Sequence, residues 1–202
     1  MNGVNLQAID QKELHERRKY GGQTPACRED DFRRVREGIN EAWGSGDIES
    51  VLAWMDNSLE LAFVFDNHAA LLARGLYERA LINAYQDTRS NFLGWTLPAL
   101  KFLFNKANPE KLRAEGDPMP ERERYTLYRG VSGKRHERRV SGISWTDSME
   151  TARWFANRFD LLGPAVYTIT VSADDILAYL NGRNESEYLL RLPPPKKPRR
   201  IG

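Results

Sequence analysis

The sequence changes its pattern once, near residue 109, and this change constrains the fold more than any other feature. Before it, apolar residues recur at three- and four-residue spacing, as on one side of a helix. After the polar, proline-containing segment 109–124, short runs alternate between apolar and polar residues, as in half-buried strands. The chain is therefore expected to place a helical part before a strand-rich part, which is an α+β arrangement.

The first part contains several stretches with helical spacing and helix-end residues. Asp30 and Asp31 precede one stretch and Gly44 follows it, as expected for a capped helix. Pro98 falls in the first turn of another, which should end before Pro109. The segment after Pro109 is expected to be a loop. We predict helices, one or two of them in the longest stretch, within residues 32–43, 46–75, 76–88 and 96–108.

The second part contains four strand-like runs and two short stretches with helical spacing. Ser172 is a candidate N-cap for the second of these stretches. We predict strands within 125–131, 139–146, 164–171 and 187–192, and helices within 147–159 and 172–180.

The strand-rich part is too small to bury a good core alone, and the apolar helices also need a partner surface. We therefore expect a single domain over residues 30–192, with a helical lobe at 30–108 and a strand-rich core at 121–192. Residues 1–29 are expected to form a mobile N-terminal extension. The tail 193–202, "PPPKKPRRIG", is basic and rich in proline; we expect it to be disordered and able to contact an acidic partner.

Composition argues against several classes of protein. The net charge is only +2, from 30 basic and 28 acidic residues among 202, which gives little support for bulk attraction to nucleic acid or a membrane. The single cysteine, Cys27, excludes an intramolecular disulfide and a cysteine-based metal site. His15, His68 and His136 show no metal-ligand spacing, so no metal is expected.

Targeting signals are not evident either. The first twenty residues lack the apolar run of a signal peptide. The most apolar window, 59–65, is far too short to span a bilayer. We expect a cytoplasmic protein, in its own cell or in a host cell, with no membrane partner.

Three short motifs carry the residues with the clearest chemical potential. Arg129 and Gly130 lie at the end of one predicted strand, and Ser144 and Thr146 flank Trp145 in the next. Glu185 and Glu187 open the last strand. Taken singly, each has an ordinary explanation: an arginine in a surface ion pair, a helix-capping threonine, and acids in a solvated turn.

Taken in order, "LYRG", "GISWTDSMETARWFA" and "RNESEYLL" resemble the arginine–serine–glutamate class of mono-ADP-ribosyltransferases, and look like its compact bacterial and phage members. The resemblance covers only the last part of the chain. It implies an ADP-ribosyltransferase-like fold, a split mixed β-sheet preceded by a helical lobe. It also implies that NAD is the substrate.

The resemblance also implies roles for the residues that bind NAD. The planar guanidinium of Arg129 would grip a phosphate or brace the ribose. The backbone of Gly130 could approach the nicotinamide closely. Ser144 would hold the nicotinamide ribose, Thr146 would support the strand end, and Trp145 could stack on a ring of NAD.

Catalysis would fall to Glu187, Glu185 and Ser144. NAD loses nicotinamide through an oxocarbenium-like state, and Glu187 would accept the ribose 2′-hydroxyl and stabilise the developing positive charge. Ser144 would orient Glu187, and Glu185 would bind the incoming nucleophile or take its proton. Trp154 and Phe155 are further candidates for stacking, although helical spacing favours a core position for Phe155.

The predicted function is transfer of ADP-ribose from NAD to a macromolecule, with a protein arginine as first choice because of Glu185. Nucleic acid is an alternative acceptor, suggested by the basic run 131–140 and by the tail, and NAD glycohydrolase activity would use the same residues. A non-catalytic binding module of the same fold and a nucleic-acid-binding domain are the alternatives from other classes. A transferase of this class would suit a toxin or a phage protein that modifies its host, and an inhibitory partner is compatible with that role.

Overall fold

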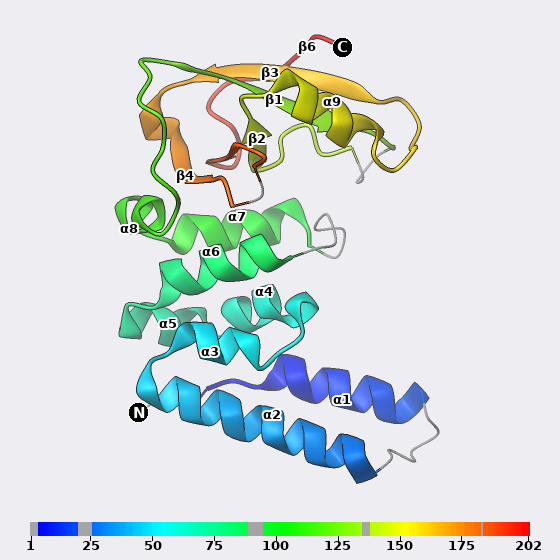
Figure 1. Ribbon diagram of the computed structural model, residues 1–202, viewed down its shortest axis with the longest axis vertical. Coiled ribbons are helices and arrows are strands. Elements are labelled where there is room, and N and C mark those ends of the chain that lie inside the picture. Colours follow the sequence, from blue (N-terminus) through cyan, green and yellow to red (C-terminus); the bar gives the residue numbers. More distant parts are fainter. Residues whose placement is uncertain (1–3, 20–25, 89–94, 135–137, 183) are drawn as a thin grey trace. The chain divides into compact units, whose positions relative to one another are not determined.

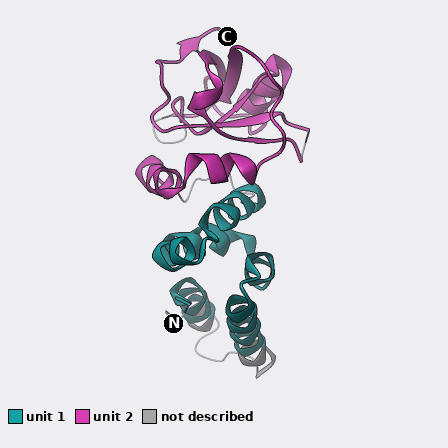
Figure 2. Ribbon diagram, turned by 90° about the vertical axis from the view of Figure 1, so that its left-hand side faces the viewer, with its two compact units in different colours: residues 1–94 teal, residues 95–202 magenta. Residues whose placement is uncertain are grey.

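The computed structural model describes residues 4–19, 26–88, 95–134, 138–182 and 184–202 (Figure 1). It forms two compact units, Met1–Gly94 and Trp95–Gly202 (Figure 2). The α+β class is confirmed, with helices and a six-stranded sheet. Where a single domain was expected over 30–192, the chain is divided at residue 94, so the last helix of the expected helical lobe, Leu97–Lys106, belongs to the unit that contains the sheet.

The first unit contains helices only among its described residues. Its N-terminal part differs from the expected mobile extension, because residues 7–19 are helical and Ile9 is buried. The backbone N–H of Asn5 also donates to Oδ1 of Asn67 over 2.7 Å. Residues 1–3 and 20–25 lie outside the described residues. The helices are α1 (Gln7–Lys19), α2 (Ala26–Ser45), α3 (Ile48–Ala53), α4 (Asn57–Asp66), α5 (His68–Arg74) and α6 (Tyr77–Asp87).

The long apolar stretch 46–75 forms three short helices because capping residues interrupt it. The side chain of Asp47 accepts from the N–H of Ser50 and begins α3, and that of Asp56 accepts from Ser58 and begins α4. Gly75, with a φ of 70°, ends α5 in the left-handed conformation that glycine adopts easily.

The second unit begins with α7 (Leu97–Lys106) and α8 (Pro109–Ala114). The expected loop after Pro109 therefore starts with a helix. Oδ1 of Asn108 caps it by accepting from the N–H groups of Glu110 and Lys111, over 2.9 and 3.1 Å. Pro109 suits the first helical position, where its missing N–H costs nothing. Nη2 of Arg113 on α8 donates to the carbonyl of Ile176 over 3.0 Å, which ties this helix to the sheet.

The sheet has the strand order β4-β5-β2-β1-β3-β6, and every pairing between its described strands is antiparallel. The expected mixed sheet is therefore wrong in this respect. Helix α9 (Met149–Asn157) packs on β1 and β3. The strands are β1 (Tyr125–Val131), β2 (Ser144–Thr146), β3 (Ala165–Val171), β4 (Ile176–Leu180), β5 (Glu187–Leu190) and β6 (Arg199–Arg200).

Two elements differ from the sequence expectation. The expected helix 172–180 is a 3-10 turn (Ala173–Asp175), capped by Ser172, followed by the fully buried strand β4. A short continuous apolar run fits a buried strand as well as a helix, so spacing alone could not decide. The tail expected to be disordered pairs through β6 with β3, in the register Tyr167↔Arg200 and Thr168↔Arg199.

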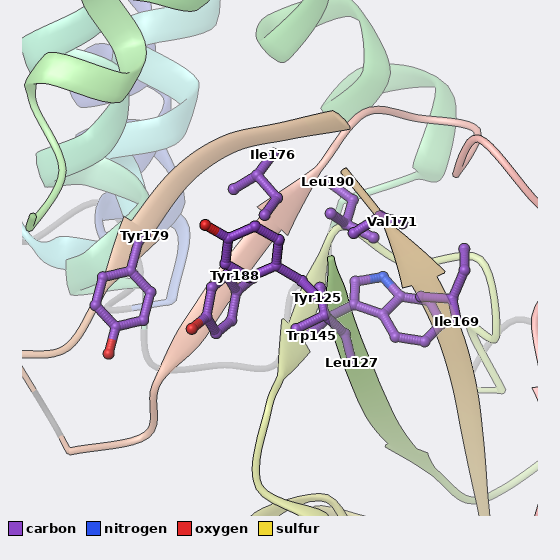
Figure 3. Packing of buried hydrophobic residues seen from close by; sticks show 9 residues of the cluster. All are labelled: Tyr125, Leu127, Trp145, Ile169, Val171, Ile176, Tyr179, Tyr188 and Leu190. Carbon is purple, nitrogen blue, oxygen red and sulfur yellow. The ribbon is translucent and has the colours of Figure 1, made fainter. Parts of the chain in front are cut away.

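One face of the sheet carries the main apolar core of this unit (Figure 3). Trp145 is the largest of its fully buried side chains. The rings of Tyr125 and Tyr188 lie 5.7 Å apart, and those of Tyr179 and Tyr188 lie 4.7 Å apart. These ring contacts join β1, β4 and β5, and Trp145 of β2 belongs to the same cluster.

Candidate functional site

The three sequence motifs lie on three neighbouring strands, β5, β2 and β1. Thr146 of β2 is the register partner of Tyr128 on β1 and of Glu187 on β5. Arg129 follows Tyr128 directly, so the fold brings "YRG", "SWT" and the second acid together across one part of the sheet.

The faces of these strands separate the candidates into two groups. Trp145 is opposite Tyr188, and both point into the core, so Ser144, Thr146 and Glu187 take the other face by strand alternation. Arg129 comes two residues after the core residue Leu127, so by strand alternation its side chain leaves β1 on the core face. The structure therefore brings Ser144 and Glu187 onto one face, and Arg129 approaches β2 from the other.

The guanidinium of Arg129 is bound to main-chain carbonyls. Nε donates to the carbonyl of Arg139 over 2.8 Å, and Nη1 donates to the carbonyl of Ser144 over 2.5 Å. A Cβ on Gly142 would lie 2.3 Å from Nη2, so glycine there makes room for the guanidinium. Among the described residues one partner pair joins β1 to β2, and Arg129 links these strands beyond it. Its observed contacts hold the sheet together, unlike the phosphate contact that the resemblance implies.

Gly130 also has a structural reason that the sequence did not indicate. A Cβ at this position would lie 1.8 Å from the carbonyl oxygen of Ala152 and 2.6 Å from the nitrogen of Ala156, both on α9. Glycine is required here because the helix backbone approaches the strand closely. The expected reason, close approach of nicotinamide, is not needed to explain this residue.

The expectation that Trp145 stacks on NAD is wrong. Its side chain is 2% exposed, and Nε1 donates to the carbonyl of Gly142 over 2.9 Å. A buried indole with its N–H satisfied is a core residue and offers no face to a ligand.

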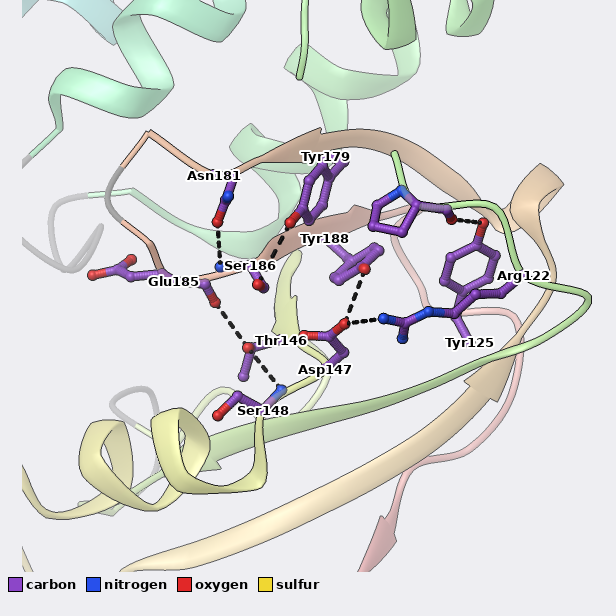
Figure 4. Close-up of polar contacts among 11 residues, drawn as sticks. Arg122, Tyr125, Thr146, Asp147, Ser148, Tyr179, Asn181, Glu185, Ser186 and Tyr188 are labelled. Carbon is purple, nitrogen blue, oxygen red and sulfur yellow. Dashed lines mark hydrogen bonds and ion pairs between the residues drawn. The ribbon is translucent and has the colours of Figure 1, made fainter. Parts of the chain in front are cut away.

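Thr146 connects β2 to the acid motif. Its buried hydroxyl donates to the backbone carbonyl of Glu185 over 2.8 Å and accepts from the N–H of Ser148 over 3.1 Å (Figure 4). Ser148, two residues after Thr146, caps α9 by accepting a hydrogen bond from the N–H of Thr151. Thr146 thus fits the expected support of the strand end, and it fixes the backbone of Glu185 directly.

The backbone on both sides of Glu185 is left-handed, with φ of 55° at Asn184 and 45° at Ser186. Such a conformation costs a non-glycine residue roughly 1–3 kcal/mol and persists only where surrounding contacts hold it. Oδ1 of Asn181 accepts from the N–H of Ser186 over 3.3 Å, and the Tyr179 hydroxyl lies 3.4 Å from Oγ of Ser186. Figure 4 shows the carboxylate of Glu185 projecting away from these contacts. Strain of this kind concentrates at functional sites.

A second polar group, centred on Asp147, fixes β5 from the core face. Oδ2 of Asp147 accepts from the hydroxyl of Tyr188 over 3.2 Å and pairs with Nη2 of Arg122 at 2.8 Å. Burial, followed by the charge of Asp147, raises the pKa of Tyr188, so this hydroxyl stays protonated and donates. Sequence reasoning missed this group; its one signal was an acid directly after "SWT".

Sequence reasoning also missed Arg158, the residue that follows α9. Its guanidinium carbon lies 4.2 Å from the ring centroid of Phe159 and 5.1 Å from that of Phe155. Burial lowers the pKa of Arg158, and the charge of Glu185 acts in the opposite direction. Trp154 is 58% exposed. Phe155 is half-buried, so it does not take the core position that helical spacing predicted for it.

Comparisons of the chain with models of protein families, with curated proteins and with solved structures find no match. In the described part of the chain, no three His, Cys, Asp or Glu side chains gather as a metal site would require. The helices described are all too short or too polar to cross a membrane.

Proposed function

We propose that this chain is an NAD-dependent mono-ADP-ribosyltransferase, built on an antiparallel sheet in place of the mixed sheet that the resemblance implies. The observation that carries the proposal is the meeting of the three motifs on adjacent strands, with Thr146 paired to both neighbours. The three segments are far apart in sequence. Other strands and helices lie between them along the chain, yet β5, β2 and β1 are direct neighbours in the sheet. A resemblance by chance would not require this adjacency.

In the proposed reaction, the bond between nicotinamide and C1′ of the ribose breaks. The bonding electrons pass to the nicotinamide ring and neutralise its charge, leaving an oxocarbenium-like sugar. A nucleophile of the acceptor forms the new bond to C1′ and loses a proton to Glu185. Glu187 accepts a hydrogen bond from the ribose 2′-hydroxyl and stabilises the positive charge on the sugar. Ser144, on the same face of the neighbouring strand, holds the ribose.

The remaining motif residues act by position. The Thr146 hydroxyl holds the carbonyl of Glu185, and Arg129 holds the carbonyl of Ser144. Gly130 lets α9 lie against β1 beside them. Loss of any of these would move the acids relative to NAD, and displacements of about 1 Å can cost roughly 100-fold in rate.

The test is release of nicotinamide from NAD by the purified chain. We expect Glu187→Gln to lower the rate by about 100- to 1000-fold, the range typical for loss of one aligned electrostatic group. The matched control is Glu123→Gln, an exposed glutamate before β1, which should leave the rate unchanged.

Circular dichroism must show that both variants keep the fold. Equal rates for Glu187→Gln and the unchanged chain would remove Glu187 from the chemistry. No nicotinamide release by the unchanged chain, with or without cell extract as a source of acceptor, would overturn the proposed function.

A further inference from the structure

The end of α9 and the segment after it present large apolar side chains to solvent. Trp154 is 58% exposed, Phe159 50% and Leu162 67%. Single exposed apolar residues are common, but a group of them within one short segment marks a binding surface. We call Trp154, Arg158, Phe159 and Leu162 the α9 platform.

Arg158 lies among the rings of this platform. Its guanidinium carbon is 4.2 Å from the ring centroid of Phe159 and 5.6 Å from that of Trp154. Trp154 packs edge-on against Phe155, with ring centroids 5.0 Å apart. The platform therefore combines exposed aromatic faces with a planar cation, the two groups on which nucleobases stack.

The loop after β1 brings further cations to the same surface. The N–H of Gly133 donates to the carbonyl of Leu162 over 2.8 Å, and Nη1 of Arg138 donates to the carbonyl of Gly163 over 2.6 Å. Lys134, the next residue after Gly133, is exposed. The rest of this basic run, residues 135–137, lies outside the described residues.

The cations around the platform outnumber the acids because of the loop after β1. Arg153 and Arg158 are matched by Glu150 and Asp160 within residues 149–164, and Lys134 and Arg138 add positive charge from that loop. Cations that contact phosphates, interleaved with exposed aromatic rings, are the usual means of binding a single strand without sequence preference.

Glu185 connects this surface to the proposed site. The hydroxyl of Thr146 donates to the backbone carbonyl of Glu185 and accepts from the N–H of Ser148, the N-cap of α9, so the acid motif is tied to the start of this helix. The charge of Glu185 also acts on the pKa of Arg158, against the effect of burial. An acceptor arginine that approached Glu185 would meet the like charge of Arg158, which disfavours it. A base that stacks on the platform would meet no such repulsion.

We propose that the α9 platform binds single-stranded nucleic acid and that this strand is the acceptor of ADP-ribose. The binding surface stands on the exposed rings and the cations around them; the acceptor role rests on the proposed function. This differs from the protein arginine that the sequence resemblance placed first.

The binding test uses the full chain without NAD. Fluorescein-labelled single-stranded DNA and RNA 20-mers are titrated, and anisotropy is measured at low and high salt. We expect saturable binding that weakens as salt increases, and Trp154→Ala should weaken it by about tenfold, as for loss of one stacked base. Phe159→Ala should act in the same direction.

Trp54→Ala is the matched control, because Trp54 is also exposed, at 46%, but lies in the helical unit. It should leave oligonucleotide affinity unchanged. Binding that no concentration saturates, or an equal loss in Trp54→Ala and Trp154→Ala, would overturn the platform as a nucleic-acid surface.

The acceptor role is tested with labelled NAD and cell extract, followed by separate digestion with nuclease and protease. Label released by nuclease supports the proposal, and label released only by protease overturns it in favour of a protein acceptor. If oligonucleotides bind the platform but no label is transferred to any macromolecule, the proposed function fails while the binding surface stands.

Discussion

A buried acid of the helical unit, Glu60, and a buried hydroxyl of the unit containing the sheet, Thr146, have opposite effects on the fold. In the helical unit, Glu60 of α4 is 3% exposed, and its Oε2 has no hydrogen-bond partner among the described residues. In the sheet unit, the buried hydroxyl of Thr146 both donates and accepts, and it joins residues 39 positions apart in the chain. The buried hydroxyl of Thr146 thus fixes the geometry of the motifs, whereas the buried carboxyl of Glu60 lowers stability.

Replacing Glu60 is expected to have the largest effect on stability and therefore tests this comparison most strongly. Burial raises the pKa of Glu60 from 4.5 to about 7, with smaller contributions from Asp87 and Asp56. The folded chain therefore holds this proton more tightly than the unfolded chain. Its contribution to stability is fully present below pH 4.5 and is lost as the pH rises through about 7.

We expect Glu60→Gln to raise the free energy of unfolding at pH 8 by up to about 3 kcal/mol, and to change it little at pH 4.5. The measurement is urea denaturation followed by circular dichroism across this pH range. Glu123→Gln, exposed in the sheet unit, should show no such pH dependence.

A pH-independent effect of Glu60→Gln would mean that the carboxylate is solvated or paired in solution. The contrast between Glu60 and Thr146 would then disappear.

Two glycines, one in each unit, extend the comparison. Replacing them by alanine should change the free energy of unfolding in opposite directions, and by less than Glu60→Gln. Gly44 lies on α2, and a Cβ added there would meet no described atom within 4 Å apart from its chain neighbours and the nearby backbone of its own helix. A Cβ on Gly130 would instead meet the backbone of α9. We expect Gly130→Ala to lower the free energy of unfolding by about 1–3 kcal/mol through overpacking. Gly44→Ala should raise it by up to about 1 kcal/mol, because alanine favours the helix.

Both values come from the same denaturation experiment. Gly130→Ala should in addition slow nicotinamide release, since α9 and β1 must separate to admit the methyl group. A neutral Gly130→Ala would show that α9 does not lie against β1 as described.

Much of the fold could be predicted where local signals and tertiary packing agree. Pro98 marks the first turn of α7, and the strands β1, β2, β3 and β5 lie within the predicted runs. The run "ILAYL" of β4 is predicted as a helix because it shows no alternation of apolar and polar residues. In the structure it is a strand with all five residues buried. Helix α1 and strand β6 were missed because distant partners stabilise them, α4 in one case and β3 in the other.

The site could be predicted only in part, for a similar reason. The motifs gave the correct strands, but not the direction of each side chain, which depends on register. The pairing Trp145↔Tyr188 sends the tryptophan into the core, and Arg129 reaches carbonyls that lie near it only after folding. The ion pair of Asp147 with Arg122 and the effect of Glu185 on the pKa of Arg158 likewise depend on tertiary structure.

The most direct test of the central claim is the two-dimensional amide NMR spectrum of the labelled chain during titration with NAD. The account predicts saturable shifts at Ser144, Thr146 and Glu187, on β2 and β5, and unchanged amides in α3 and α6. A spectrum that NAD leaves unaltered, or in which the helical unit responds while these strands do not, would contradict it.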